Sequence, residues 1–302
     1  MKTQLFYFIG LLFTFMCQFA NAQELESNGK YFPQNPALAI VADKCSDIMY
    51  EAMDEYSFKK LLPIHSKCEQ VLVYYYDSIH PDQTISAAKK AEMMLDELEN
   101  TLDCDVAMTT IDMGYVINLR YTFLQYRMIA LSKELIKHDT SFKKEIDAWQ
   151  NLMVELDIFI TSAIHIDWFN GSGASNAIID GLNDIYACRV NDLMRLICMD
   201  DGKYSFGNIP SDSGRDTLNA SIQDAKLRVL SSNEIETGDD YKANALKELH
   251  RNVMNEQIIK AWDKWMKIRK TTSFSTINHD YSIKSASMLT IDLSNRILGN
   301  IE

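Results

Sequence analysis

Two tryptophans and an arginine share one face of a predicted helix near the C-terminal end of the chain. The stretch AWDKWMKIRK, residues 261–270, carries Trp262 and Trp265 three residues apart and Arg269 four residues later. Side chains at these spacings lie on one side of an α-helix. Such a set could stack on a ligand or a base, or the rings could pack between helices while Arg269 snorkels or stacks at the edge. We expect packing, because Ile258 extends the same stripe.

The sequence contains little else that predicts chemistry. It has no HExxH or Glu-x-x-His pattern for a metal, no G-x-S-x-G nucleophile and no glycine-rich phosphate loop. The acidic pairs at 200–201 and 239–240 lack the twelve-residue calcium-loop pattern. Isolated histidines such as His165 and His279 are expected at the surface or in loops. We therefore expect no catalytic, cofactor-binding or metal-binding residue, and no cofactor.

The cysteines leave the disulfide connectivity open. Five cysteines follow residue 22, and an odd number allows at most two internal disulfides. Cys188 and Cys198 are expected on one helix, where they would lie about 15 Å apart, too far to bond each other. The chain has no CxxC pair, so zinc or thioredoxin-type chemistry is not predicted. The five are Cys45, Cys68, Cys104, Cys188 and Cys198.

The first 22 residues have the features of a secretory signal peptide. Lys2 gives a positive start, residues 5–19 are mainly apolar, and Ala-Asn-Ala at 20–22 matches the small-x-small cleavage pattern. The apolar run is shorter than the roughly 20 residues that a membrane-spanning helix needs. We expect the mature chain to begin at Gln23, to have no transmembrane segment, and to be periplasmic or secreted.

Composition favours long helices and an acidic surface. The 302 residues include only 11 Gly and 5 Pro, so few residues interrupt helices, and a hydrophobic fraction of 47% supports a proper core. Lys and Arg total 30 against 42 Asp and Glu, which gives a net charge of −12. An acidic chain repels phosphate backbones, so nucleic acid is not an expected partner, whereas a basic protein is compatible with the charge.

Apolar residues recur at three- and four-residue steps through most of the chain, as in amphipathic helices. The best strand candidate, VLVYYY at 71–76, lies within such a helical pattern. The fold class that we predict is all-α, an antiparallel helical bundle. The expected helices are 37–55, 66–80, a segment after Asp82, 106–138, 141–164, 176–199, 217–231, 241–272 and 279–298.

Two segments of the chain resemble each other, which predicts that one helical unit occurs twice. EIDAWQNLM at 145–153 resembles EQIIKAWDKWM at 256–266, and each is followed by a loop and by a helix with Arg and then Leu. The echo aligns Trp149 with Trp262 and Arg189 with Arg296. The predicted organisation is a signal peptide at 1–22, a polar leader with N-terminal helices at 23–103, a first unit at 104–199, a linker at 200–216 and a second unit at 217–302.

Each unit resembles the LprI-like family of lysozyme inhibitors, which are small exported helical domains. The family pattern is a Trp-x-x-x-Arg helix, a Gly-Ser loop, and a late helix with Thr or Cys, then Arg, then Leu. The first unit matches it through Trp149, the loop 171–173, Cys188, Arg189 and Leu193. The second unit matches it through Gln257, Trp265, Arg269, Thr290, Arg296 and Leu298.

The chain departs from the family pattern at two points. Met153 stands where the first unit would carry its helix arginine, and the second unit has no cysteines, so the family's disulfide cannot form there. The resemblance implies that the signature residues are structural. They are Trp149, Arg189, Trp262, Trp265, Arg269 and Arg296.

The expected function is binding by an exported helical protein, with inhibition of a lysozyme-like or other lytic hydrolase as the role that the resemblance suggests. The alternative is an envelope enzyme whose polar site is assembled from separate helices. A cleft with two or more converging carboxylates or histidines would favour the enzyme. An exposed apolar or acidic patch without such a cluster would favour binding.

Overall fold

The computed structural model describes residues 36–51, 55–101, 110–167, 173–198, 206, 214–232, 252–272 and 277–299. Every regular element in these ranges is an α-helix, so the predicted all-α fold is confirmed. The expected signal peptide and Cys104 lie outside the described residues. The helices are α2 (Pro36–Tyr50), α3 (Phe58–Ile79), α4 (Ala87–Glu99), α5 (Thr110–His138), α6 (Phe142–Asp167), α7 (Ala174–Ile197), α8 (Gly214–Ser232), α10 (Asn252–Thr271) and α11 (His279–Gly299).

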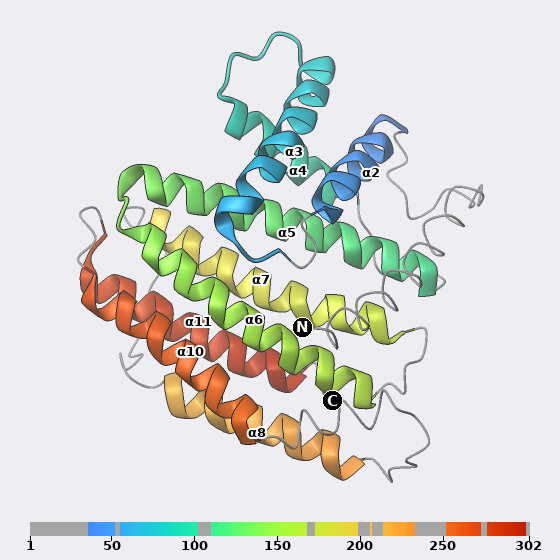
Figure 1. The fold of residues 1–302 in the computed structure, drawn as a ribbon. Helices are drawn as coiled ribbons and strands as arrows, with labels where there is room; N and C mark the ends of the chain where they lie inside the picture. The colour runs from blue at the N-terminus through green and yellow to red at the C-terminus, as the bar shows by residue number, and fades with distance from the viewer. Residues whose placement is uncertain are drawn as a thin grey trace.

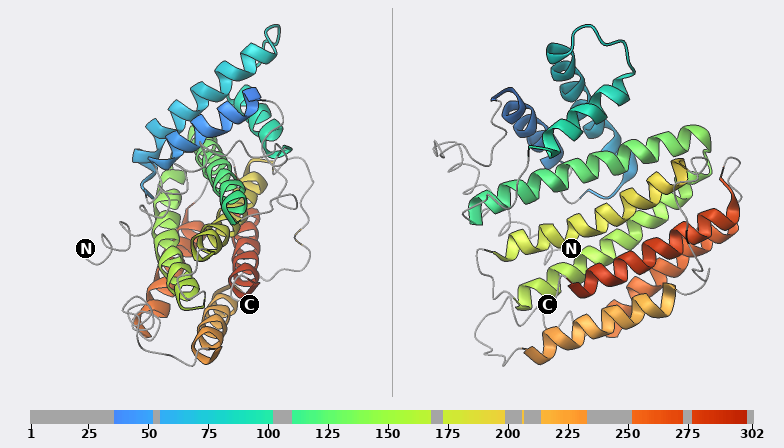
Figure 2. Two further views of the ribbon diagram at one scale, coloured as in Figure 1. Left: turned by 90° about the vertical axis from the view of Figure 1, so that its right-hand side faces the viewer. Right: turned by 180° about the vertical axis from the view of Figure 1, so that it is seen from behind.

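The helices from α5 onwards form an elongated bundle, and α2, α3 and α4 cross its outer side next to α5 (Figure 1). Helix α5 packs along α7, α7 along α11 and α11 along α8, while α6 packs along α10. Both views in Figure 2 show these helices side by side, with the N-terminal helices beyond α5. The bundle interior therefore lies between α6, α7, α10 and α11.

Helix α3 begins earlier than the sequence predicts. We expected a start near position 66, but the helix extends back to Phe58 and includes Pro63. A proline in a helix removes one backbone N–H donor. Burial of Phe58 and Leu61 against the rest of the N-terminal helices offsets this loss. The segment 71–76, which was the best strand candidate, is part of the same helix, as its helical context indicated.

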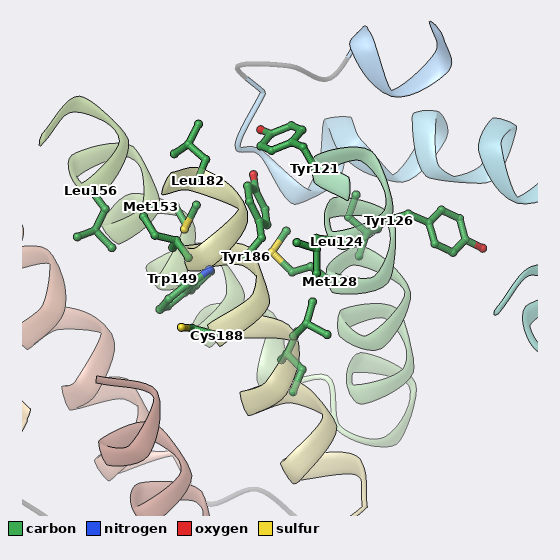
Figure 3. Packing of buried hydrophobic residues seen from close by; sticks show 14 of the residues in the cluster. Tyr121, Leu124, Tyr126, Met128, Trp149, Met153, Leu156, Leu182, Tyr186 and Cys188 are labelled. Carbon is green, nitrogen blue, oxygen red and sulfur yellow. The ribbon is translucent and has the colours of Figure 1, made fainter. Parts of the chain in front are cut away.

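Close approach between helices sets the positions of α5 and α7. A Cβ atom at Gly114 on α5 would lie 2.7 Å from Oδ1 of Asn176 on α7, so glycine permits this contact. Further along, Tyr121 of α5 meets Tyr186 of α7 edge to face, with ring centroids 5.2 Å apart. Figure 3 shows this aromatic contact beside the residues that line the α6–α7 interface, among them Trp149.

The linker and the duplicated unit are the two organisational predictions that reach the described residues. Helix α8 begins at Gly214, so the end of the predicted linker 200–216 is helical. Phe206, within that linker, packs against Tyr281 of α11 with ring centroids 4.8 Å apart. Each predicted unit contains a long helix laid along its last helix, α5 on α7 and α8 on α11. The duplication itself stays a prediction.

Candidate functional site

Three helices, α6, α7 and α10, bring charged side chains together in the middle of the bundle. Arg189 of α7 donates two hydrogen bonds to Glu145 of α6, from Nη1 to Oε1 (2.9 Å) and from Nη2 to Oε2 (2.6 Å). Its Nη1 also donates to Oδ2 of Asp192, one turn later on α7 (2.7 Å). All three side chains are buried. Bidentate pairing of this kind fixes the position of α6 relative to α7 and also stabilises the paired charges.

Helices α10 and α11 complete the cluster from the other side. Arg269 Nη2 of α10 donates to Oδ1 of Asp192 (2.6 Å), and Ser285 Oγ of α11 donates to the same oxygen (2.7 Å). The indole Nε1 of Trp265 donates to Glu145 Oε1 (2.6 Å). Each carboxylate thus accepts hydrogen bonds from more than one helix. We call Glu145, Arg189, Asp192 and Arg269 the buried charge cluster.

Two tryptophan rings form one wall of the buried charge cluster. Trp149 and Trp265 meet edge to face, with centroids 5.3 Å apart and planes at 65°. The guanidinium carbon of Arg189 lies 4.8 Å from the Trp149 ring centroid, and that of Arg269 lies 5.7 Å from Trp265. Cation–π attraction is strongest where water is excluded, as it is here. Trp265 is therefore the core residue that the sequence predicts.

The expected position of Arg269 at the edge of the core was wrong. Its exposed fraction is 0%, because Asp192 and Glu145, with an Nη1-to-Oε1 distance of 3.7 Å to the latter, supply negative charge in the interior. Neither partner is close to Arg269 in the chain. The spacing of residues along α10 shows which face Arg269 occupies but not which carboxylates lie opposite.

The electrostatics of the cluster favour the charged forms of Asp192 and Arg189. Burial alone would raise the pKa of Asp192, but the guanidinium groups of Arg269 and Arg189 hold it below its usual value. Burial likewise disfavours the charged form of Arg189, yet Glu145 and Asp192 raise its pKa. The cluster has two guanidinium and two carboxylate groups, and Arg195 of α7 also acts on Asp192. The Nε atoms of Arg189 and Arg269 are buried without a hydrogen-bond partner among the residues that the structure describes. All four side chains are shielded from solvent, and therefore from a substrate.

The remaining signature residues lie apart from this cluster. Trp262 is buried and its Nε1 donates to Thr290 Oγ1 of α11 (3.1 Å). Arg296 is 58% exposed and donates from Nη1 to Asp184 Oδ1 of α7 (2.9 Å). Arg189 and Arg296, which the sequence echo aligns, therefore have different environments. Of the six signature residues, the structure brings together Trp149, Arg189, Trp265 and Arg269.

Sequence reasoning missed Glu145 and Asp192 of the buried charge cluster, and Ser285, which donates a hydrogen bond to Asp192. One signal was available, because Asp192 follows Arg189 at a spacing that lets the two side chains pair on one helix. Glu145 begins the segment that echoes residues 256–266, but a glutamate in the first turn of a helix is ordinarily a surface residue. Ser285 carries no signal by itself.

A second buried polar site lies beneath the N-terminal helices. His65 of α3 stacks on Tyr126 of α5, with centroids 4.2 Å apart. Lys133 Nζ donates to His65 Nδ1 (3.3 Å) and to Glu69 Oε2 (3.1 Å). Burial, together with the Lys133 charge, lowers the pKa of His65 to about 3, so the ring is neutral at pH 7. Because the ring is neutral, its 3.6 Å contact with Glu69 is not an ion pair.

Helices α3 and α4 form a hairpin that projects from the bundle (Figure 1), and several of its apolar side chains are exposed. Tyr74 is 70% exposed, and Ile79, Ile85 and Met93 are also exposed. The four residues come from the end of α3, the connecting loop and α4. Large exposed apolar groups that gather on one projecting element indicate a contact surface. We call these four residues the hairpin patch.

Specific contacts hold the hairpin in shape. The hydroxyl of buried Tyr76 donates to Gln83 Oε1 in the connecting loop (2.5 Å). Lys90 Nζ of α4 pairs with Asp77 Oδ1 of α3 (2.5 Å). Ser86 caps α4 by accepting a hydrogen bond from the Lys89 backbone N–H (3.3 Å). The hairpin patch is therefore presented on an ordered element and needs little ordering on binding.

The hairpin is acidic as well as apolar. Between positions 77 and 99 the sequence has six carboxylates and two lysines. Three of the carboxylates, on α4, surround Arg127 of α5, whose Nε, Nη2 and Nη1 donate to Glu92 (2.9 Å), Asp96 (2.6 Å) and Glu99 (2.6 Å). These ion pairs fasten α4 to the bundle.

The described residues contain no group of three or more His, Cys, Asp or Glu side chains that could hold a metal ion. None of the described helices is long and apolar enough to cross a membrane. No protein-family model matches the sequence, and no similar protein was found among the curated proteins or the solved structures. The resemblance to LprI-like domains therefore stays a prediction, and the function is argued from the surface and the interior of the molecule.

Proposed function

We propose that the chain is an exported, non-enzymatic helical protein that binds a basic protein partner through the hairpin patch. The partner class that we propose is a lysozyme-like or other lytic hydrolase, which the protein inhibits. The observation that carries the proposal is the exposure of Tyr74, Ile79, Ile85 and Met93 on an ordered, projecting and acidic hairpin.

The apolar part of the hairpin supports binding to a protein rather than to a small molecule. Tyrosine and methionine are enriched at the centres of protein interfaces. Tyrosine buries a large area with few rotatable bonds, and methionine adapts its shape to the partner surface. The patch lies on a convex projection, whereas ligand sites for small molecules are concave. A convex tip of this shape fits into a depression on the partner, such as the substrate cleft of a hydrolase.

Charge complementarity supports a basic partner. The chain as a whole carries −12, and the hairpin between positions 77 and 99 has six acidic and two basic residues. An acidic surface attracts a cationic protein and raises the rate of encounter. The same charge opposes binding to nucleic acid.

The enzyme alternative would require accessible carboxylates that converge. Asp180 and Asp184 of α7 lie near Arg296, and Asp292 of α11 lies 3.8 Å from Arg195. The pKa values of Asp180 and Asp292 are raised, mainly by burial, and nearby guanidinium groups offset only part of the rise. Asp184 pairs with Arg296 and Asp292 with Arg195, so ion-paired contacts between α7 and α11 account for these two carboxylates. Binding remains the function that the described surface supports better.

Inhibition of a lysozyme tests the proposal. The purified chain is mixed with a basic c-type lysozyme, and lysis of a bacterial cell-wall suspension and direct binding are measured. We expect slower lysis and saturable binding. Tyr74→Ser and Ile85→Ser should weaken binding by about tenfold or more, or ~1.4 kcal/mol, with an unchanged melting temperature, because both side chains are exposed.

Leu227→Ser is the matched control. Leu227 is 63% exposed on α8, away from the hairpin, so its replacement removes a similar apolar group without touching the patch. Its binding should equal that of the unaltered chain. Equal losses from Leu227→Ser and Tyr74→Ser would contradict a role for the hairpin. Absence of binding to lysozymes and to other basic lytic hydrolases would overturn the partner class.

A further inference from the structure

Two cysteines from neighbouring N-terminal helices face each other in the core. Cys45 lies on α2 and Cys68 on α3, and the two helices pack side by side. Both residues are 0% exposed, and Cys45 is the neighbour that most raises the pKa of the Cys68 thiol, so the two side chains lie close together. Both thiols are free in the structure. Two buried thiols that lie close together on packed helices meet the first requirement for a disulfide, since the sulfurs must become bonded neighbours.

We propose that Cys45 and Cys68 are a disulfide pair that covalently joins α2 to α3. The inference goes beyond the proposed binding function and shares with it only the expectation of export. Exported proteins meet an oxidising environment in which such pairs persist. The bond would close a loop that contains the connection between α2 and α3. It would add a covalent link to a helix that otherwise holds to α3 and α5 by packing and by the hydrogen bonds of Lys44 to Tyr75 and of Tyr115 to Asp43.

The oxidation balances with a disulfide donor as the oxidant, either a thiol oxidoreductase of the exported compartment or oxidised glutathione. One cysteine thiolate attacks the donor disulfide, forming a mixed disulfide and releasing one donor thiol. The second thiolate then attacks the protein sulfur of the mixed disulfide and releases the other donor thiol. One S–S bond forms in the protein, and its two electrons and two protons end on the donor.

Burial determines when this reaction can take place. Contact with Cys45 and burial raise the pKa of the Cys68 thiol well above its usual value, so little thiolate exists in the folded chain. Buried sulfurs are also inaccessible to a donor. The bond must therefore form before α2 closes onto α3, and once formed it is shielded from reductants. Cys188 is buried on α7, and Cys198 lies at the end of that helix, so neither contacts this pair.

Mass spectrometry of the refolded chain tests the pairing. The full chain is reduced, unfolded and refolded in a mixture of reduced and oxidised glutathione, free thiols are then alkylated, and the protein is digested without reductant. We expect one peptide pair linked through Cys45 and Cys68, with a mass lower by two hydrogen atoms than the sum of the reduced peptides. Cys188 and Cys198 should be alkylated. Alkylation of Cys45 and Cys68, or linkage of either to another cysteine, would overturn the proposal.

A measurement of the melting temperature shows whether the Cys45–Cys68 disulfide stabilises the protein. Reductant applied during refolding should lower the melting temperature of the unaltered chain. It should leave that of the double variant Cys45→Ala with Cys68→Ala unchanged, and an equal shift in both proteins would contradict the assignment. Lysozyme binding through the hairpin is measured on the same samples. Loss of the linked peptides with intact binding rejects only the disulfide, and linked peptides without binding reject only the proposed function.

Discussion

The buried charge cluster and the Arg127 site use the same residue types in opposite surroundings. Arg189 and Arg269 pair with Glu145 and Asp192 in the interior of the bundle, where all four side chains are at most 1% exposed. Arg127 pairs with three carboxylates at the surface of α4, where those carboxylates are 32–55% exposed. The distances are alike, at 2.6–2.9 Å for the direct hydrogen bonds.

The difference shows that solvent, rather than geometry, decides what an ion pair contributes. In the interior each charge has lost its hydration and depends on its partners, so removal of one partner strands the others. At the surface water replaces a lost partner, and the pair contributes little. The interior cluster specifies which helices meet and in what register, whereas the Arg127 site holds the hairpin to α5 with a few removable contacts.

Loss of one interior carboxylate should have the largest effect. Asp192→Asn leaves two buried guanidinium groups with only Glu145 to balance them. We expect the free energy of unfolding to fall by about 3–5 kcal/mol, a value typical for a broken buried pair. Chemical denaturation measures it. A loss below about 1 kcal/mol would mean that water reaches the cluster, and the contrast with Arg127 would disappear.

Removal of one hydrogen bond to the cluster should have an intermediate effect. Trp265→Phe keeps an aromatic ring but removes the indole N–H that donates to Glu145. We expect a loss of about 1.5–3 kcal/mol, in the range for hydrogen bonds to charged groups. Trp262→Phe is the matched control, because it removes a neutral hydrogen bond to Thr290 and should cost about 1 kcal/mol. Equal losses would show that ring volume, not the charge of the acceptor, dominates.

The contribution of His65 to the free energy of unfolding depends on pH. Its pKa of about 3 in the folded chain lies below the ordinary 6.5, so protons bind preferentially to the unfolded chain between these values. Its contribution to stability is therefore present above about pH 6.5 and falls by about 1.4 kcal/mol for each pH unit below it. His65→Phe keeps a ring against Tyr126 and removes this dependence. Denaturation of both proteins at pH 7 and pH 5 checks it, and parallel losses would exclude His65 as the cause.

Removal of the surface arginine should have the smallest effect. Arg127→Ala frees Glu92, Asp96 and Glu99 to water, so we expect a loss of about 1 kcal/mol or less. The loss should shrink in 1 M salt, because exposed charges are screened within about 3 Å there. Denaturation at low and high salt measures both. A salt-independent loss as large as that of Asp192→Asn would contradict the difference between the Arg127 site and the buried charge cluster.

The sequence predicts helices and faces well because both are set by neighbouring residues. The apolar steps around Trp265 predict its burial, and scarce Gly and Pro predict the all-α fold. Pro63 obscured the start of α3, since tertiary burial of Phe58 outweighs a local signal. Arg269 was placed at the edge because its partners come from α6 and α7, far away in the chain. Long-range pairing of charges leaves no local pattern.

The hairpin patch shows the same limit at the surface. The helical period of residues 66–80 predicts that some apolar residues face the core, but it does not predict that Tyr74 is 70% exposed. Exposure depends on where α3 ends relative to α5, which is a property of the whole fold. The projection of a hairpin therefore has to be read from the structure.

The distribution of the buried charge cluster along the chain has a consequence for the order of assembly. Glu145, Arg189 and Asp192 belong to α6 and α7, and together they carry one net negative charge until α10 supplies Arg269. Before that helix arrives, Asp192 lacks its hydrogen bond from Arg269, and Glu145 lacks the hydrogen bond from the Trp265 indole. Arg189 and Arg195 of α7 are then the cations that act on Asp192. The hydrogen bonds of this interior are therefore complete only once α10 has packed against α6 and α7. The interior of the bundle can therefore close fully only when the C-terminal helices are present.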